Sequence, residues 1–141
     1  MPRAVVAPLV LALALASAQA RAARIVVTID GLHSAKGDLY VALFSRSQHF
    51  PDGDYSDQHA VVKARLEPMT IAFDAAPGLY AVGAYHDENG NGKLDTNFIG
   101  YPVEGYALSN GIRAVVSRPR FATAAFKVVE GDNKVALHVE Y

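Results

Sequence analysis

The stretch Asp38-Leu39-Tyr40-Val41-Ala42-Leu43-Phe44 decides the fold class of this 141-residue chain. Its side chains alternate between two faces, as in a β-strand, and both faces are apolar. A strand that is apolar on both faces is typical of the centre of a sheet that is covered on both sides. The sequence therefore predicts a buried central strand at this position.

Six further stretches carry strand patterns that are separated by turn residues. They are residues 24–30, 60–66, 70–73, 79–86, 121–129 and 134–141, and Gly131-Asp132-Asn133 between the last two is typical of a hairpin turn. Helical periodicity is absent, and only short turns are expected within residues 45–57 and 114–117. The pattern predicts one all-β domain, an antiparallel β-sandwich of about seven strands of immunoglobulin-like or prealbumin-like type.

The first twenty residues have the features of an export signal. Arg3 precedes an apolar run over residues 4–16, and Ser17-Ala18-Gln19-Ala20 ends in the small-x-small pattern that signal peptidase cuts. We therefore expect a cleaved signal peptide over residues 1–20 and a single domain over 21–141, which is periplasmic or secreted. An uncleaved N-terminal anchor is the alternative. No later segment is apolar enough to span a membrane.

Composition excludes several classes of protein. The formal net charge is −1, which gives no basic face for a nucleic acid. The chain has no cysteine, so an exported domain of this size must be stable without disulfides and cannot use a cysteine nucleophile. Ser109, a candidate nucleophile, lacks the Gly-x-Ser-x-Gly motif of serine hydrolases. The sequence predicts no catalytic residue and no organic cofactor.

The stretch Asp87-Glu88-Asn89-Gly90-Asn91-Gly92-Lys93-Leu94-Asp95 follows the expected strand 79–86. Its alternating oxygen-bearing side chains and its glycine at the sixth position are typical of a Ca²⁺-binding loop. The predicted ligands are the side chains of Asp87, Asn89, Asn91 and Asp95, the carbonyl of Lys93, and Glu104. Asp74 or water is the alternative to Glu104. Because Phe98 stands where an EF-hand has its bidentate glutamate, we expect weak affinity, with a Kd of ~10⁻⁴ to 10⁻³ M.

The same residues are also strong turn formers. Asn89-Gly90 and Asn91-Gly92 tolerate positive φ, and Asp and Asn side chains can bond to their own backbone. A metal-free loop that is closed by such bonds would use similar residues. The sequence leaves both interpretations open.

Four motifs occur in one order along the chain: Pro77-Gly78-Leu79-Tyr80-Ala81-Val82, the stretch from His86 to Asp95, Gly100-Tyr101-Pro102-Val103-Glu104-Gly105-Tyr106, and Ser109-Asn110. In this combination the sequence resembles the DUF2141 family of exported bacterial proteins, over nearly the whole of residues 25–141. The resemblance implies a prealbumin-like or immunoglobulin-like sandwich and no assigned activity.

Three aromatic residues, Phe98, Tyr101 and Tyr106, lie in the connection after the acidic loop. They can be core anchors, or they can contact a sugar or a peptide. The leading functional hypothesis is therefore a non-enzymatic module that binds a protein or carbohydrate partner in the cell envelope through a Ca²⁺-ordered loop surface. The alternative is a small periplasmic hydrolase that uses the carboxylates of Asp87, Asp95 and Glu104. A structural envelope protein without a ligand is a third hypothesis.

Overall fold

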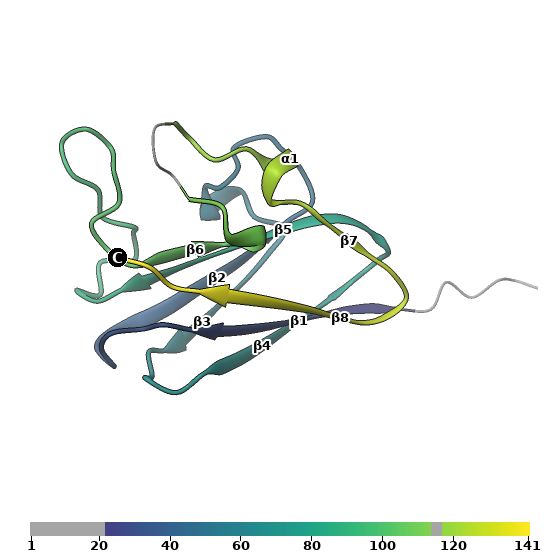
Figure 1. The fold of residues 1–141 in the computed structure, drawn as a ribbon, viewed down its shortest axis with the longest axis horizontal. Coiled ribbons are helices and arrows are strands. Elements are labelled where there is room, and N and C mark those ends of the chain that lie inside the picture. Colours follow the sequence, from purple (N-terminus) through teal and green to yellow (C-terminus); the bar gives the residue numbers. More distant parts are fainter. Residues whose placement is uncertain (1–21, 114–116) are drawn as a thin grey trace, which may run out of the picture.

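The computed structural model describes residues 22–113 and 117–141. The predicted signal peptide, and residues 114–116 of the turn expected at 114–117, lie outside the described residues. In chain order the described elements (Figure 1) are β1 (Ala23–Asp30), β2 (Asp38–Phe44), η1 (Gly53–Tyr55), β3 (Gln58–Lys63), β4 (Met69–Ala75), β5 (Gly78–Asp87), β6 (Tyr106–Leu108), η2 (Ser109–Gly111), α1 (Phe121–Ala124), β7 (Phe126–Val128) and β8 (Gly131–His138).

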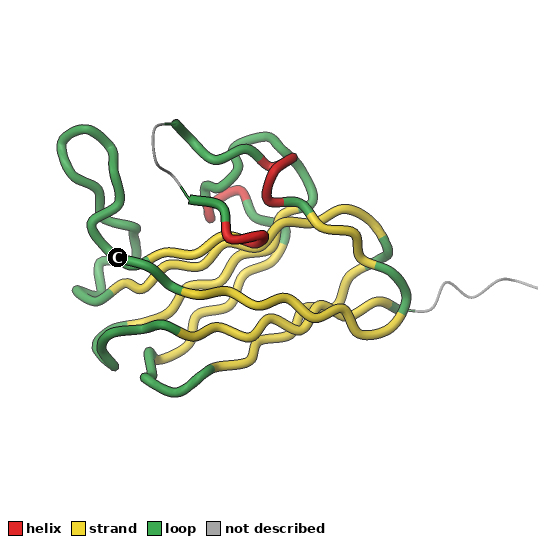
Figure 2. The backbone as a smooth tube through the Cα atoms, viewed as in Figure 1, coloured by secondary structure: helices red, strands yellow, loops and turns green. Residues whose placement is uncertain are grey.

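The strands form two layered sheets, so the predicted all-β sandwich is confirmed (Figure 2). One sheet has the order β4-β1-β8, and the other has the order β3-β2-β5-β6, with β7 pairing with the first residues of β5. The prediction for β2 is confirmed in its bounds and in its central position, between β3 and β5.

Pairing is antiparallel in every ladder between the described strands except one. β8 runs parallel to β1, from Ala23 opposite Gly131 to Asp30 opposite His138. The sandwich is therefore not wholly antiparallel. The parallel pair also means that β1 and β8 end at the same end of the molecule.

The predicted hairpin at residues 131–133 is wrong. Gly131 begins β8, which therefore occupies residues 131–138 rather than the predicted 134–141. β7 and β8 belong to different sheets, so the chain between them crosses from one sheet to the other. The Asn133 side chain accepts a hydrogen bond from the N–H of Val129 and donates to its carbonyl, which stabilises this crossing in place of a hairpin turn.

Two other features differ from the sequence prediction. The predicted strand at 121–129 begins as the helix α1, and only Phe126–Val128 form a strand. The short strand β6 was not predicted, because three residues are too few to show an alternating pattern. The short turn expected within residues 45–57 is confirmed by η1.

The core explains why both faces of β2 are apolar. Between the sheets, Leu39, Val41 and Leu43 of β2 belong to one buried cluster with Ile25 and Val27 of β1. A second buried cluster lies on the outer face of the larger sheet and consists of Phe44, Phe50, Ala81, Leu108 and Ala124. Each face of β2 is therefore covered, one by the facing sheet and the other by the segments that carry Phe50 and α1.

One end of the sandwich gathers most of the chemically informative residues. β1, β5 and β8 end there and β2 begins there, since Asp38 pairs with Asp87 and Asp30 pairs with His138. We call this the loop end; it comprises residues 31–37, 88–105 and 139–141. In Figure 1 the segment 88–105 projects from the loop end, away from both sheets.

Candidate functional site

The acidic loop is built around the buried carboxylate of Asp87, the last residue of β5. Its Oδ1 accepts hydrogen bonds from the N–H groups of Gly90 (2.8 Å) and Asn91 (3.1 Å), and its Oδ2 accepts one from Gly92 (2.7 Å). Gly90 and Gly92 both have φ +74°, which glycine adopts without strain. Three N–H groups of the loop are therefore satisfied by one side chain.

The remaining oxygens of the loop also accept hydrogen bonds. Asp95 accepts bonds from the amide groups of Asn89 and Asn91. The Oδ1 of Asn89 accepts the N–H of Asn91 (3.0 Å), and the Oδ1 of Asn91 accepts the N–H of Lys93 (2.9 Å). The predicted ligands of the loop thus lie together and form a closed hydrogen-bonded turn.

Glu104 completes the base of this loop. It is 9% exposed, its Oε1 accepts the N–H of Glu88 (3.1 Å), and its Oε2 accepts the N–H of Asp95 (3.0 Å). Asp74 lies at the opposite end of the sandwich, since it pairs with Arg24 near the start of β1. The structure therefore brings Glu104 to the loop and places Asp74 far from it.

Whether these residues fit Ca²⁺ depends on which donors face their oxygens. Asp87, Asp95 and Glu104 each face N–H groups of the protein, and Asn89 and Asn91 turn their amide nitrogens toward Asp95. Within residues 22–113 and 117–141, no group of three or more His, Cys, Asp or Glu side chains is arranged to hold a metal ion. A cation would thus require the two asparagine amides to rotate and present their oxygens.

The three predicted aromatic contact residues have different positions. Phe98 is fully exposed, Tyr101 is 39% exposed, and Tyr106 lies on β6 and is half-buried. Phe98 is part of a tight hairpin that we call the apex, residues 96–103. Ile99 (74% exposed) and Val103 (59%) expose further apolar surface there. The structure therefore separates Tyr106 from the apex.

A cluster of His33, His86 and Tyr141, of which only His86 is buried, lies beside the acidic loop and is not predicted by the sequence. His86 has no exposed surface; its Nε2 donates to the carbonyl of Lys36 (2.6 Å), and its Nδ1 forms a hydrogen bond with the hydroxyl of Tyr141 (2.6 Å). The His33 ring stacks on Tyr141 with ring centroids 3.6 Å apart, and its Nε2 pairs with Glu88. Burial raises the pKa of Tyr141. His86 has the inward parity of Val82 and Ala84, which is the sequence signal for its burial.

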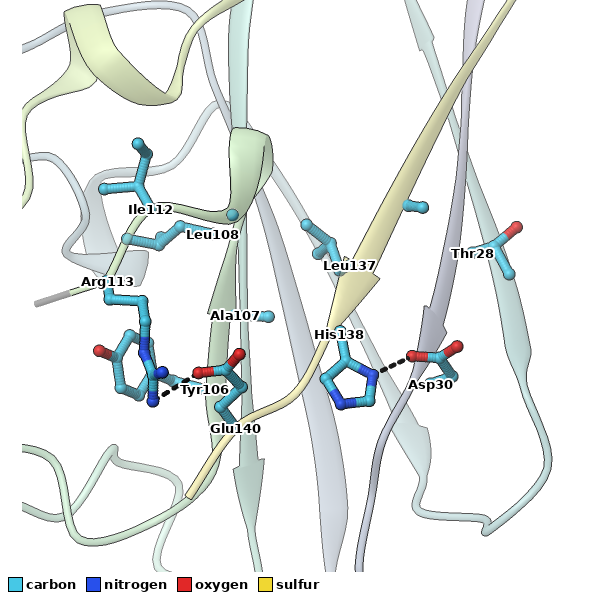
Figure 3. Close-up of a pocket in the computed structure, with 12 residues that line it drawn as sticks. Thr28, Asp30, Tyr106, Ala107, Leu108, Ile112, Arg113, Leu137, His138 and Glu140 are labelled. Atoms are coloured by element: carbon cyan, nitrogen blue, oxygen red, sulfur yellow. Dashed lines mark hydrogen bonds and ion pairs between the residues drawn. The ribbon is translucent and has the colours of Figure 1, made fainter.

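A groove of about 290 Å³ lies where the edges of the two sheets meet, between β6 and β8 (Figure 3). Two pairs of side chains line it: the ion pair of Arg113 with Glu140, and His138 hydrogen-bonded to Asp30. In each pair the two side chains face one another, as the dashed lines in Figure 3 show, so each already has a partner within the groove. The two pairs thus occupy the groove between the sheet edges, and their side chains offer few unbonded polar groups to a ligand.

Fold and site define a small β-sandwich protein with an Asp/Asn loop closed by its own carboxylates. A family model described as "Uncharacterized protein conserved in bacteria (DUF2141)" matches residues 27–136. The chain belongs to this family, which confirms the resemblance seen in the sequence. Comparisons with curated proteins and with solved structures found no match. Across the described residues, no helix has the length and hydropathy needed to cross a membrane.

Proposed function

We propose that the chain is an exported, non-enzymatic binding module of the bacterial cell envelope and that the apex is its contact surface. The observation that carries this proposal is the exposure of Phe98 (100%) and Ile99 (74%) at the tip of a loop held by hydrogen bonds. Soluble proteins rarely leave neighbouring large apolar side chains in water without a use for them. Export is supported by the signal-like sequence of residues 1–20.

The arrangement of the carboxylates favours binding over catalysis. A hydrolase that used Asp87, Asp95 and Glu104 would need at least two of them to face a substrate. Asp87 is fully buried, and both oxygens of Glu104 accept backbone N–H groups. Their contacts stabilise the loop that carries the apex, and this arrangement disfavours the hydrolase hypothesis.

A weak Ca²⁺ site remains part of the proposal. Asp95 is the best placed carboxylate, because it is half-buried rather than buried and is bonded only by side-chain amides. Rotation of the Asn89 and Asn91 amides would add two oxygens beside it, and the carbonyl of Lys93 lies in the same loop. That rotation would break the bonds from both amides to Asp95 and the bonds that their oxygens accept from the N–H groups of Asn91 and Lys93. This cost agrees with the weak affinity expected from the sequence.

The sequence leaves open whether the partner is a protein or a carbohydrate. The side chains of the apex favour one of these two classes. Sugars are recognised through polar groups together with aromatic faces, whereas Phe98 and Ile99 have no hydrogen-bonding groups in their side chains. A partner that offers an apolar surface fits the apex better than a polysaccharide does.

The proposal is tested by co-sedimentation with bacterial envelope fractions. We expect the protein to bind these fractions and the double variant Phe98→Ser/Ile99→Ser to bind at least about tenfold less, because two apolar side chains no longer leave water. The matched control is Leu79→Ser, which removes a 59% exposed side chain at the other end of β5. Equal binding by the protein and the double variant, or no binding by either, would contradict the proposal.

A further inference from the structure

The apex is an uncharged protrusion. No charged side chain occurs from Thr96 to Val103, and the flanking Asp95 and Glu104 are bonded to the base of the loop. Figure 2 shows the loop extending outward from the sheets. Charge is therefore confined to the base, and apolar side chains occupy the far end.

Four backbone N–H groups of the apex are bonded within the apex itself. The N–H of Asn97 donates to the carbonyl of Tyr101 (2.8 Å), and the N–H of Gly100 donates to the carbonyl of Asn97 (2.9 Å). The Asn97 side-chain oxygen accepts the N–H groups of Ile99 (3.1 Å) and Tyr101 (3.0 Å). Because these four N–H groups need no bonds from water, the cost of moving the hairpin into the interfacial layer of a bilayer is lowered.

We infer that the apex inserts into the interfacial layer of a lipid bilayer, with Phe98 and Ile99 entering first. This inference rests on the proposed binding function and names the chemistry of the partner. Tyr101, on the returning arm of the hairpin, has the amphipathic ring that favours the headgroup level. Since the apex carries no charge, the attachment depends on apolar burial rather than on anionic lipids.

The small size of the apex favours a bilayer over a protein partner. A stable protein interface uses roughly 20–30 residues on each side, whereas the exposed large apolar side chains of the apex are only Phe98, Ile99, Tyr101 and Val103. A bilayer needs no complementary shape and accepts a narrow protrusion. The hairpin is already ordered by its own hydrogen bonds, so little conformational entropy is lost on insertion.

A second copy of the chain is the strongest competing occupant. A hollow of about 440 Å³ beside Phe50, Pro119 and Phe121 is apolar enough to receive a phenyl ring. Its rim includes Arg118 and Arg120, and Arg118 donates to the carbonyls of His49 and Phe50. Such a contact would make the protein associate with itself at rising concentration in the absence of lipid.

The test uses a tryptophan as a reporter, since the chain contains none. The test uses the chain that begins at Arg21, the product expected from cleavage of the signal-like residues 1–20, and its cooperative thermal unfolding is recorded first. Phe98→Trp places the reporter at the apex, and Leu79→Trp places a matched reporter at the other end of β5. Both are mixed with vesicles of phosphatidylcholine, with and without phosphatidylglycerol, at low and at high salt.

We expect vesicles to shift the emission of the reporter at position 98 to shorter wavelength and to protect it from iodide. The effect should occur with both lipid compositions and persist at high salt, and the reporter at position 79 should not respond. The double variant Phe98→Ser/Ile99→Ser should co-sediment with vesicles at least about tenfold less, with an unchanged melting temperature, because both side chains are exposed.

Three results would overturn the inference. If vesicles leave the reporter at position 98 unchanged while envelope fractions still bind through the apex, a protein partner is indicated and the proposed binding function stands. If its emission shifts with protein concentration in the absence of lipid, the occupant is a second copy. If neither vesicles nor envelope fractions bind, the lipid inference and the proposed function both fail.

Discussion

Glu104 accepts a hydrogen bond from the backbone N–H of Asp95 at 3.0 Å, across nine residues of chain. Its other carboxylate oxygen accepts the N–H of Glu88 at 3.1 Å. One nearly buried side chain therefore joins the start and the end of the acidic loop, and it does so at the base of the hairpin that carries the apex.

Replacing Glu104 should lower stability rather than affect a reaction. Glu104→Ala leaves two backbone N–H groups without their acceptor, and we expect the free energy of unfolding to fall by about 1–3 kcal/mol. Glu104→Gln should also destabilise the protein. Its side-chain NH₂ group is a donor, and it would face the N–H of either Glu88 or Asp95, which is also a donor. Urea denaturation measures both effects, with the exposed Glu67→Gln as control. A Glu104→Gln protein of wild-type stability would contradict this structural role.

Gly37 should tolerate no side chain. A Cβ at this position would lie 1.9 Å from the carbonyl oxygen of Asp87, and its φ is +70°. Gly90 is a matched control, because its φ is +74° but a Cβ there meets nothing within 4 Å. We expect Gly90→Ala to cost about 1–2 kcal/mol, the penalty of the left-handed backbone alone, and Gly37→Ala to cost at least about 2 kcal/mol more. Equal losses in urea denaturation would show that the contact with Asp87 relaxes freely.

The sequence predicts those parts of the fold whose apolar pattern follows directly from burial. β2 was recognised because both of its faces are apolar, and each face is covered by a different cluster. The parallel pairing of β8 with β1 was not predictable, because alternation shows which face a residue occupies and not which strand lies beside it. The helix α1 was missed because four residues are too few to show a helical period.

The candidate site was predictable in its members but not in its chemistry. Asp87, Asn89, Asn91 and Asp95 are close in sequence, and the nearby Glu104 joins them in the structure. The same oxygens can face a cation or a backbone N–H, so residue type alone cannot decide between the two. The bond between His86 and Tyr141 spans 55 positions and leaves no local pattern.

Two partly buried tyrosines should make the protein sensitive to alkali. Burial raises the pKa of Tyr141, and burial together with the neighbouring Tyr40 raises the pKa of Tyr85. A pKa that is raised on folding gives stability that is fully present below the unfolded value of about 10 and is lost as pH rises through the folded value. We expect a constant melting temperature from pH 8 to about 9.5 and a decrease above about pH 10.

Tyr85→Phe tests the origin of that alkaline decrease. The variant loses the bond from the Tyr85 hydroxyl to the carbonyl of Gly92 (3.1 Å), so it should be less stable at neutral pH and lose less stability in alkali. Absorption of tyrosinate, recorded beside each melt, shows whether ionisation accompanies unfolding. An unchanged alkaline decrease in this variant would assign the effect to other groups.

Ser109 should act in the fold and not as a nucleophile. Its hydroxyl has no exposed surface, accepts the N–H of Val82 (3.0 Å) and donates to the carbonyl of Ala124 (2.6 Å), joining β5 to α1. Ser109→Ala leaves both buried groups unpaired, and we expect a loss of about 1–3 kcal/mol in urea denaturation. The exposed Ser117→Ala is the control. A loss no larger than that of the control would mean that water or a shift of α1 replaces both bonds.

Calcium should raise the melting temperature only slightly, and Asp95 is the carboxylate on which this effect should depend. At about five times a Kd of ~10⁻³ M, a ligand that binds the folded state alone adds roughly 1 kcal/mol, which is a shift of a few degrees for a domain of this size. Thermal melts in EDTA, Ca²⁺ and Mg²⁺ measure this shift. Asp95→Asn is the informative variant, because it removes a carboxylate that is bonded only by the Asn89 and Asn91 amides. A variant of Asp87 would be less informative, because three backbone N–H groups need its carboxylate even without metal. A shift that Mg²⁺ does not reproduce and that Asp95→Asn abolishes would establish the ion site. The absence of a Ca²⁺-selective shift would mean that the hydrogen bonds of Asp87, Asp95 and Glu104 alone order the loop that presents the apex.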